Sequence, residues 1–326
     1  MKYIQFLVLA VMLLSEYSLG TNNTPIVMWH GMGDSCCNPL SLGRIKKIIE
    51  QNSPFPIYIK SIQIGTNMIE DIENSFTMNV NLQVKDVCKQ IMKDKKLTKG
   101  YNAIGFSQGG QFLRAVAQRC PDPPMLNLIS IGGQHQGVFG LPHCLYENHK
   151  WCDELRKLLT NGAYWRWIQE KFVQAEFWHD PLHEDIYIKK SIFLADINNE
   201  RKMNYDYRKN LMNLKNLVLI MFEDDTMVIP KESSWFEFYT PGQDINITKL
   251  EDSVLYQIDR IGLKCLNEDK KLHFISLPGD HLQFTEEWWI LHFDGIFIDS
   301  AATQMEQIHI SFKEIKRAVQ SELNKL

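Results

Sequence analysis

A serine between two closely spaced glycines is the feature of this 326-residue sequence that most directly suggests chemistry. Ser107 stands at the centre of a GxSxG motif, Gly105-Phe106-Ser107-Gln108-Gly109, between a run typical of a strand and a run typical of a helix. A sharp turn there makes the serine hydroxyl project from the end of the strand. It also brings the two backbones so close that positions 105 and 109 accept little beyond hydrogen. We therefore expect Ser107 to be a nucleophile.

A serine hydroxyl needs a base to accept its proton and an acid to orient that base, and with this motif they follow the serine in the order acid, then histidine. Asp225 comes just after an expected strand at 217–222, and His281 follows an expected strand at 272–277. Both should lie at the edge of the sheet that carries the serine, because the carboxyl ends of parallel strands meet there. Asp224 is the neighbouring alternative to Asp225, and spacing does not separate the two.

The developing oxyanion of an acyl-transfer reaction needs two amide donors. One is expected from Gln108, the residue after the nucleophile. The second is expected from the loop after the first strand, Trp29-His30-Gly31-Met32-Gly33-Asp34, whose glycines let the backbone approach a substrate. We favour Met32 as this donor, with a plain tight turn as the alternative reading of the loop.

Apolar runs alternate with helical periodicity from Pro25 to Ile131, as in βαβ units that build a parallel sheet. The expected strands in this part lie at 26–29, 57–62, 101–106 and 125–131. The expected helices lie at 42–50, 80–92 and 110–120. Together with the GxSxG motif, this alternation predicts an α/β protein of the α/β-hydrolase fold, with a mostly parallel central sheet flanked by helices.

The regular alternation stops between Gly132 and Asn216, where aromatic residues cluster. This segment, at about 132–216, is expected to be a helical insertion, or cap, before the strand that leads to Asp225. We expect one α/β-hydrolase catalytic domain at 21–300 and an amphipathic tail at 301–326. Packing of the tail on the domain is favoured over membrane contact, because its basic residues are offset by acidic ones.

The first 20 residues are expected to be a signal peptide, with Lys2 ahead of the apolar run Ile4 to Leu14. A membrane anchor is less favoured because the run is shorter than the roughly 20 residues that a span needs. No later stretch is long and apolar enough to suggest an integral membrane span. The net charge of −4 leaves no basic excess for binding nucleic acid.

The seven cysteines agree with an oxidising compartment and show no zinc-type pair of CxxC motifs: Cys36, Cys37, Cys88, Cys120, Cys144, Cys152 and Cys265. A bridge between Cys88 and Cys120 would tie together two helices beside one strand. Cys144 and Cys152 would close a small local loop. Cys36 and Cys37 are either separate thiols or a vicinal disulfide, and spacing alone does not choose between the pairings.

The sequence resembles the lysosomal palmitoyl-protein thioesterases from about Pro25 to about Ile296. The matching strings are WHGMGDSCCNPL at 29–40, GFSQGGQFLRAVAQRC at 105–120, GGQHQGVFG at 132–140, AEFWHDP at 175–181, SIFLADIN at 191–198 and GDHLQ at 279–283. These long strings are far more specific than the GxSxG motif alone.

The resemblance implies a serine thioesterase that removes long-chain acyl groups, chiefly palmitate, from cysteines of proteins undergoing lysosomal breakdown. It assigns Ser107 as nucleophile, Asp225 as acid and His281 as base, and it supports Met32 and Gln108 as oxyanion donors. The implied partners are S-palmitoylated proteins or peptides and other acyl thioesters, and neither a cofactor nor a metal is expected. The implied location is the lysosome, with secretion possible.

The same resemblance implies further features. The insertion would help to wall an acyl groove, for which we name Val173 and Trp178, and Cys265 would be the odd thiol. The implied disulfides are Cys36–Cys37, Cys88–Cys120 and Cys144–Cys152. Asn246 is the expected glycosylation site, in the sequon Asn246-Ile247-Thr248.

Two other functions remain open from the sequence. A thiolate leaves readily because its pKa is near about 8.5, but the same three residues also hydrolyse oxyesters, so a secreted lipase or carboxylesterase is the alternative. A lipid carrier that has lost catalysis is the third hypothesis, and the intact set of Ser107, Asp225 and His281 counts against it.

Overall fold

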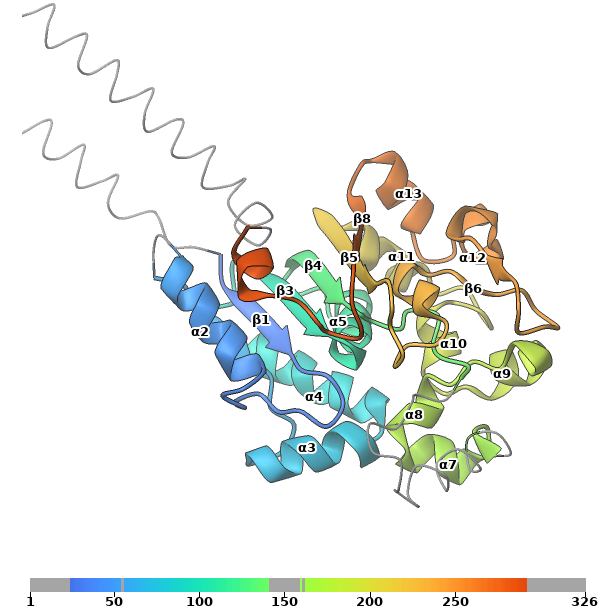
Figure 1. Ribbon diagram of the computed structural model, residues 1–326, viewed down its shortest axis with the longest axis horizontal. Helices are drawn as coiled ribbons and strands as arrows, with labels where there is room; N and C mark the ends of the chain where they lie inside the picture. The colour runs from blue at the N-terminus through green and yellow to red at the C-terminus, as the bar shows by residue number, and fades with distance from the viewer. Residues whose placement is uncertain (1–23, 54–55, 141–158, 160–161, 292–326) are drawn as a thin grey trace, which may run out of the picture. The chain divides into compact units, whose positions relative to one another are not determined.

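The computed structural model describes residues 24–53, 56–140, 159 and 162–291 (Figure 1). The predicted signal peptide at 1–20, the predicted Cys144–Cys152 disulfide and the predicted tail at 301–326 lie outside these residues. The chain divides into two compact units, residues 1–283 and 284–326. In the second unit, residues 286–291 are helical. Everything described below belongs to the first unit.

The first unit is built on a six-stranded sheet in which every neighbouring pair is parallel. In spatial order the strands are β2 (Ile59–Ser61), β1 (Ile26–Trp29), β3 (Tyr101–Phe106), β4 (Met125–Ile131), β5 (Asn216–Phe222) and β8 (Leu272–Leu277). Strands β1 and β3 are buried along their whole length, because helices cover both faces of a parallel sheet. The sheet confirms the predicted α/β-hydrolase fold class.

The register of the strands decides what lies at the carboxyl edge of the sheet. Trp29 pairs with Gly105, and Gly105 pairs with Ser130. On the other side, Phe222 pairs with Leu277. The loops that follow β1, β3, β4, β5 and β8 therefore begin side by side at one edge, where open α/β sheets place their ligands.

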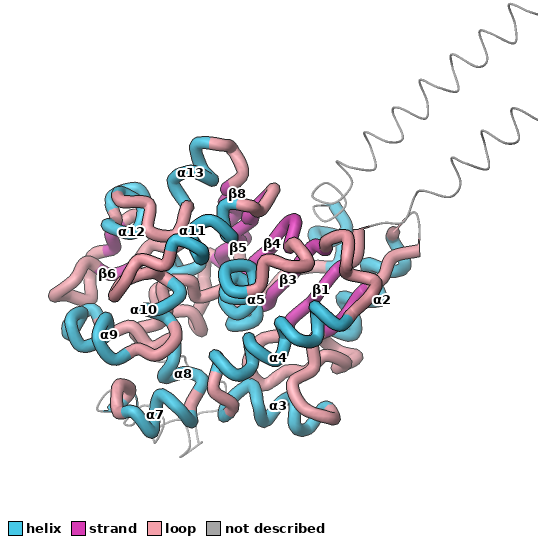
Figure 2. Tube along the Cα trace, turned by 180° about the vertical axis from the view of Figure 1, so that it is seen from behind, coloured by secondary structure: helices cyan, strands magenta, loops and turns pink. Residues whose placement is uncertain are grey.

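Helix α5 (Gln108–Arg119) is the central helix of the layer that Figure 2 shows in front of the sheet. It packs on β3 and β4 and against the flanking helices α4 (Val80–Lys93) and α11 (Tyr205–Met212). The predicted apolar face of α4 is confirmed, since Val80, Val84, Val87 and Ile91 are all buried. Among the described residues before α4 lie the helices α2 (Leu42–Asn52) and α3 (Met68–Thr77).

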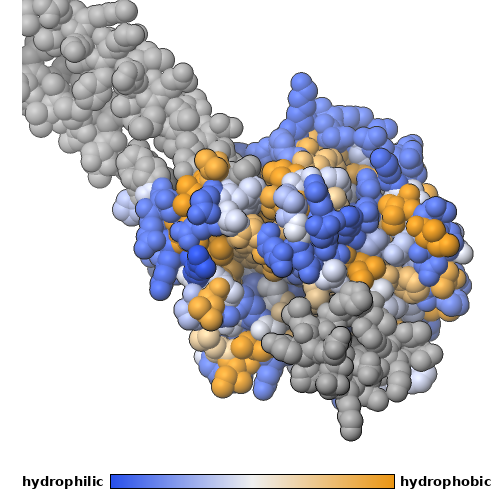
Figure 3. Space-filling model, viewed as in Figure 1, coloured by the Kyte–Doolittle hydropathy of each residue, from blue (hydrophilic) through white to orange (hydrophobic). Residues whose placement is uncertain are grey.

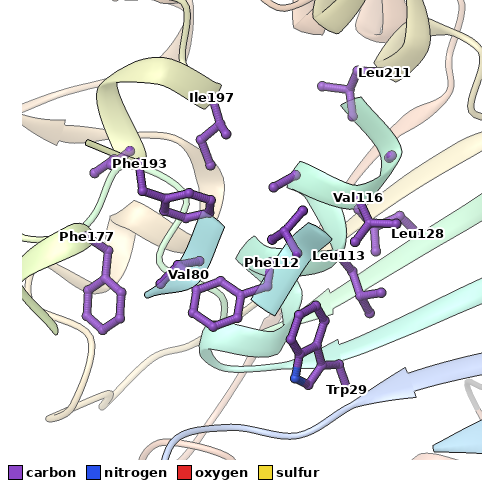
Figure 4. Close-up of a cluster of buried hydrophobic side chains, with 14 of the residues drawn as sticks. Trp29, Val80, Phe112, Leu113, Val116, Leu128, Phe177, Phe193, Ile197 and Leu211 are labelled. Carbon is purple, nitrogen blue, oxygen red and sulfur yellow. The ribbon is translucent and has the colours of Figure 1, made fainter. Parts of the chain in front are cut away.

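The core joins the sheet, the helical layer and the insertion around Phe112 of α5 (Figure 4). The Phe112 ring meets Trp29 of β1 edge-on at 5.4 Å between centroids, and it meets Phe193 of the insertion at 5.7 Å. Aromatic pairs in this geometry add to the stabilisation that comes from burial alone. The insertion is thus packed into the same core as the sheet.

Short helices make up the described part of the chain between β4 and β5, as the sequence predicts for the insertion. They are α7 (Arg166–Lys171), α8 (Val173–Glu176), the 3₁₀ helix η1 (Pro181–His183), α9 (Glu184–Lys190), α10 (Leu194–Ile197) and α11. Figure 1 shows α7, α8, α9 and α10 gathered at the lower right. A backbone bridge between Val138 and Trp178 attaches this segment to the loop after β4.

Small elements complete the described unit after β5. They are η2 (Lys231–Trp235), the antiparallel pair β6 (Phe238–Tyr239) and β7 (Ile247–Thr248), η3 (Leu250–Asp252), α12 (Val254–Gln257) and α13 (Leu263–Glu268). The face seen in Figure 3 is largely hydrophilic, with apolar residues scattered across it, as on most soluble proteins. Within the described ranges, no helix has the length and apolar character to cross a membrane.

Two disulfides occur in the described part of the chain. Cys88 of α4 is bonded to Cys120, directly after α5, and the neighbours Cys36 and Cys37 are bonded to each other. The first closes a loop across a separation of 32 residues, which the chain-entropy model values at roughly 4 kcal/mol of stability. Cys265 is a free thiol.

Candidate active site

Ser107 occupies a strained turn between β3 and α5. Its φ of 52° and ψ of −126° are unusual for a residue with a side chain, a conformation that costs of order 1–3 kcal/mol. The backbone around it is tied down, since the Ser107 N–H donates to the Ile131 carbonyl at 2.8 Å. From 101 to 118 every residue is buried except Ser107. The fold thus leaves this one residue partly exposed in an otherwise buried segment.

The glycines of the motif are required by the closeness of three backbones. A Cβ on Gly105 would lie 2.3 Å from the Gly110 nitrogen, and a Cβ on Gly109 would lie 2.4 Å from the Trp29 carbonyl oxygen. Neither obstacle is a movable side-chain end. Only hydrogen fits at both positions, which is the steric reason for the GxSxG spacing.

His281 and Asp225 are joined by a hydrogen bond of 2.7 Å between Nδ1 and Oδ2. The Asp225 side chain is completely buried, and its other oxygen accepts backbone N–H groups from Met227 at 2.9 Å and Val228 at 2.8 Å. Asp224 is exposed to solvent. The geometry therefore distinguishes the two aspartates that the sequence leaves open, and it directs Nδ1 of His281 to Asp225 and leaves Nε2 as the other ring nitrogen.

Three glycines lie directly beside Ser107 or His281. A Cβ on Gly31 would lie 3.2 Å from Cβ of Ser107, and one on Gly133 would lie 3.4 Å from the Ser107 carbonyl oxygen. A Cβ on Gly132 would lie 3.1 Å from Cε1 of His281. The loops after β1 and β4 therefore approach the Ser107 turn through glycines. The space left there is too small for side chains at these positions.

Of the two predicted oxyanion donors, Gln108 directly follows the nucleophile in the chain, and Met32 directly follows Gly31, which approaches Ser107. Gln108 begins α5, where the first-turn amides lack helical partners and carry the positive end of the dipole. The backbone of Gly31, just before Met32, lies close to the Ser107 side chain. The Met32 side chain is half-buried, and its sulfur lies 2.7 Å from Nε2 of Gln174 in α8.

Asp71 of α3 fixes the loop that carries Met32, and sequence reasoning missed it. This carboxylate is fully buried. Its Oδ1 lies 3.0 Å from Nε2 of His30 and accepts the Ile64 N–H at 2.7 Å, and its Oδ2 accepts the Cys36 N–H at 2.8 Å. One buried acid thus ties both ends of the loop to α3. An aspartate in a helix gives no sequence signal of this role.

Ser75, one turn further along α3, links the two expected oxyanion donors. Its hydroxyl accepts the Gly33 N–H at 2.9 Å, next to Met32. Its carbonyl accepts Nε2 of Gln108 at 3.2 Å. Helix α3 therefore contacts both sides of the expected oxyanion hole.

A second network of buried polar side chains lies next to the Ser107 turn, and the sequence did not predict it. Arg114 of α5 donates from Nε to Nδ1 of His135 at 3.2 Å, and Nε2 of His135 is 2.8 Å from the Ser130 hydroxyl. Burial lowers the pKa of Arg114 to about 9. Burial, and then the Arg114 charge, hold the pKa of His135 well below its usual value, so the ring is neutral and donates from Nε2. The Ser130 hydroxyl occupies the space where Gly110 or Gly133 would carry a Cβ, 2.2 Å away in each case.

The two residues named for the acyl groove lie in the core that the insertion shares with the sheet. Val173 of α8 is fully buried, and Trp178 is 4% exposed. The Trp178 ring packs on Phe139 at 5.4 Å between centroids. Helix α8, which carries Val173, contacts α3, so this helix and the Met32 loop border the same element.

A parallel sheet in this strand order, with a serine elbow after β3 and an aspartate–histidine pair after β5 and β8, defines an α/β-hydrolase. Comparison with known proteins narrows this class. The model of the palmitoyl protein thioesterase family matches residues 25–281. The chain therefore belongs to the palmitoyl-protein thioesterase family.

Individual relatives agree with this assignment. The chain is 52% identical to palmitoyl-protein thioesterase 1 of Caenorhabditis elegans over 284 residues, which cover 87% of this chain and 95% of that protein. It is 36% identical to palmitoyl-protein thioesterase 3 of Dictyostelium discoideum over 284 residues, or 86% and 92% of the two chains. It is 35% identical to human lysosomal thioesterase PPT2 over 175 residues, or 52% and 56%.

Proposed function

We propose that this chain is a serine thioesterase that hydrolyses palmitoyl and other long-chain acyl thioesters of protein cysteines through an acyl-Ser107 intermediate. The observation that carries the proposal is the bond between His281 and Asp225 at the sheet edge where the partly exposed Ser107 lies. Family membership supplies the acyl thioester as the substrate class.

The reaction follows from the roles of these groups. As Oγ of Ser107 attacks the thioester carbonyl, Nε2 of His281 accepts its proton, and buried Asp225 stabilises the imidazolium through Nδ1. The amides of Met32 and Gln108 face the tetrahedral oxyanion, each contributing about 3–4 kcal/mol in the transition state. The C–S bond then breaks and the thiolate takes the proton from His281. In the second half, water attacks the acyl carbon and gives its proton to the same nitrogen. The ester bond to Oγ then breaks, Ser107 takes that proton back, and the fatty acid is released.

The acyl chain, in this proposal, lies along the insertion beside α8, with Val173 and Trp178 among the residues that line it. Both side chains belong to the continuous apolar core, and Gln174 between them contacts the Met32 side chain at the expected oxyanion hole. A long hydrocarbon chain needs an apolar wall close to the reacting centre, and in this proposal these side chains supply part of it.

The proposed location is the lysosome, with secretion possible, reached through the predicted signal peptide. A relative that matches half of the chain is named a lysosomal thioesterase. The disulfides agree with an oxidising route. Asn246, the proposed glycosylation site, is exposed just before β7, where a glycan would meet solvent.

The proposal is tested by release of palmitate from an S-palmitoylated peptide by the wild type and by Ser107→Ala. The wild type should turn over and the variant should lose at least about 10³-fold in rate, because the nucleophile, base and acid act as one unit. Wild-type-like turnover by the variant would contradict the proposal.

The same assay with the matched palmitoyl oxyester distinguishes the lipase alternative. A thioesterase should prefer the thioester. A clear preference for the oxyester would favour a lipase or carboxylesterase, and failure of a serine-directed fluorophosphonate probe to label the wild type would favour a lipid carrier.

A further inference from the structure

Two residues outside the Ser107, Asp225 and His281 set join the loop that carries the acid to the loop that carries the base. Thr226 follows Asp225 after β5, and Asp280 precedes His281 after β8. Oδ1 of Asp280 accepts the Thr226 N–H at 2.8 Å and the Thr226 hydroxyl at 2.9 Å. The same oxygen accepts the His281 N–H at 2.7 Å. One carboxylate oxygen therefore receives hydrogen bonds from both loops.

The loop that carries His281 is also held by backbone hydrogen bonds, from the Asp224 N–H to the Gly279 carbonyl at 3.0 Å and from the Gln283 N–H to the Asp280 carbonyl at 2.9 Å. Gly279 and Leu282, on either side of Asp280 and His281, have positive φ values of 108° and 59°, so the chain turns sharply twice within four residues. His281 is partly exposed at the edge strand of the sheet. The bonds made by Asp280 fix the backbone nitrogen of His281 while Asp225 fixes its ring.

We propose that Thr226 and Asp280 are positioning residues for the base, and that their hydrogen bonds hold the His281 loop against the Asp225 loop so that the ring keeps its bond to Asp225. This inference rests on the proposed function, because it assigns His281 as the base. A loop that carries a base must hold it closely, since a displacement of about 1 Å can cost roughly 100-fold in rate.

The hydrogen bonds that Asp280 accepts also set its charge. Burial works to raise the pKa of Asp280, but the hydrogen bonds from His281 and Thr226 outweigh it and hold the pKa below its usual value. The group is therefore charged at neutral pH. In the described part of the chain, Asp225 and Asp280 are the carboxylates that bond to His281, Asp225 at the ring and Asp280 at the backbone nitrogen.

The experiment measures turnover of palmitoylated peptide and, in parallel, the rate at which a fluorophosphonate labels Ser107. Thr226→Val removes the hydroxyl but keeps the shape, and Thr226→Ser is the conservative control. Asp280→Ala removes the acceptor, and Asp280→Asn keeps an acceptor oxygen but removes the charge. Asp224→Asn, at the exposed neighbour, is the matched control and should stay within about twofold of the wild type.

We expect Asp280→Ala to lower kcat about 10- to 100-fold with little change in KM. Thr226→Val should lower kcat in the same sense and Thr226→Ser should restore it. The double variant Thr226→Val, Asp280→Ala should be little worse than Asp280→Ala alone, because both changes break the same contact. Asp280→Asn should lower kcat less than Asp280→Ala, since its amide oxygen can still accept from Thr226 and His281.

Equal kcat in the wild type, Thr226→Val and Asp280→Ala would overturn the inference, as would additive losses in the double variant. The labelling rate keeps this result separate from the proposed function. If the wild type labels but releases no palmitate, the proposed substrate class is wrong, while the labelling rates of the variants still test the positioning role.

Discussion

At the scale of the residue, the closest discrimination in this site is between Asp224 and Asp225. They are adjacent in the sequence, yet one is exposed and the other is buried with three hydrogen-bond donors around it. A buried carboxylate with this many donors keeps a fixed orientation, which is what a histidine partner requires. The difference is made by the turn after β5 and not by residue type.

We predict that Asp225→Asn lowers kcat for palmitoyl thioester by roughly 10⁴-fold, because an amide at this position favours the wrong tautomer of His281. Asp224→Asn should leave kcat within about twofold. Steady-state kinetics of both variants at saturating substrate provide the measurement. If Asp224→Asn were the damaging change, the acid would have to be reassigned by one residue.

The sequence allows Ser107, Asp225 and His281 to be proposed, because a strained turn demands glycines at fixed spacing and the chain order of the other two residues is limited. Asp71, Arg114 and Asp280 were not recognised as partners of the site. Their partners include backbone groups and side chains far away in the sequence, so their role depends on which loops meet. Neither composition nor periodicity predicts which loops these are. Polar groups of this kind are recognised only after the fold is known.

At the scale of the element, the strands of the six-stranded sheet and the helices α2, α4 and α5 were predictable because each has a regular apolar pattern. Helix α3 was not predicted, although Asn67 caps it by accepting the N–H groups of Ile69 and Glu70. Its pattern is interrupted by Asp71 and Ser75, polar residues that are buried because they bind the Met32 loop. The feature that hid the helix is the same feature that connects it to the site.

Helix α3 should therefore affect catalysis from outside the active site. We predict that Asp71→Asn lowers kcat about 10- to 100-fold, since an amide cannot accept from three donors and the Met32 loop shifts. Affinity for a palmitoyl trifluoromethyl ketone, which forms an oxyanion on the enzyme, should fall in parallel. Affinity for an unreactive thioether analogue should not.

Glu73→Gln, on the exposed side of the same helix, is the control and should change neither affinity. If Asp71→Asn lowered the melting temperature but kept kcat and the ketone affinity of the wild type, α3 would only stabilise the fold.

At the scale of the whole molecule, buried carboxyl groups in the insertion should make the stability of the fold depend on pH. Glu176 of α8 is fully buried, and its Oε1 accepts the N–H of Val80 at the start of α4 at 2.7 Å. Burial raises the pKa of Glu176 well above its usual value, even though this hydrogen bond and the more distant Arg119 lower it. Burial also raises the pKa of Glu200. Both groups are easier to bury in the neutral form.

A group whose pKa is raised on folding contributes stability fully below its unfolded pKa, here near 4.5, and this contribution is lost as pH rises through the folded value. We predict that Glu176→Gln, which keeps an acceptor for Val80 without a charge, melts with the wild type at about pH 4.5. Above that pH the variant should become progressively more stable than the wild type, by about 1.4 kcal/mol for each unit of raised pKa, or roughly 2–4 °C per kcal/mol. Melting temperatures measured from pH 4.5 to 8 provide the test. A constant difference between the two proteins across this range would mean that Glu176 does not titrate differently on folding. A variant that is more stable than the wild type only toward neutral pH would show that the wild-type junction between α8 and α4 is most stable at acidic pH.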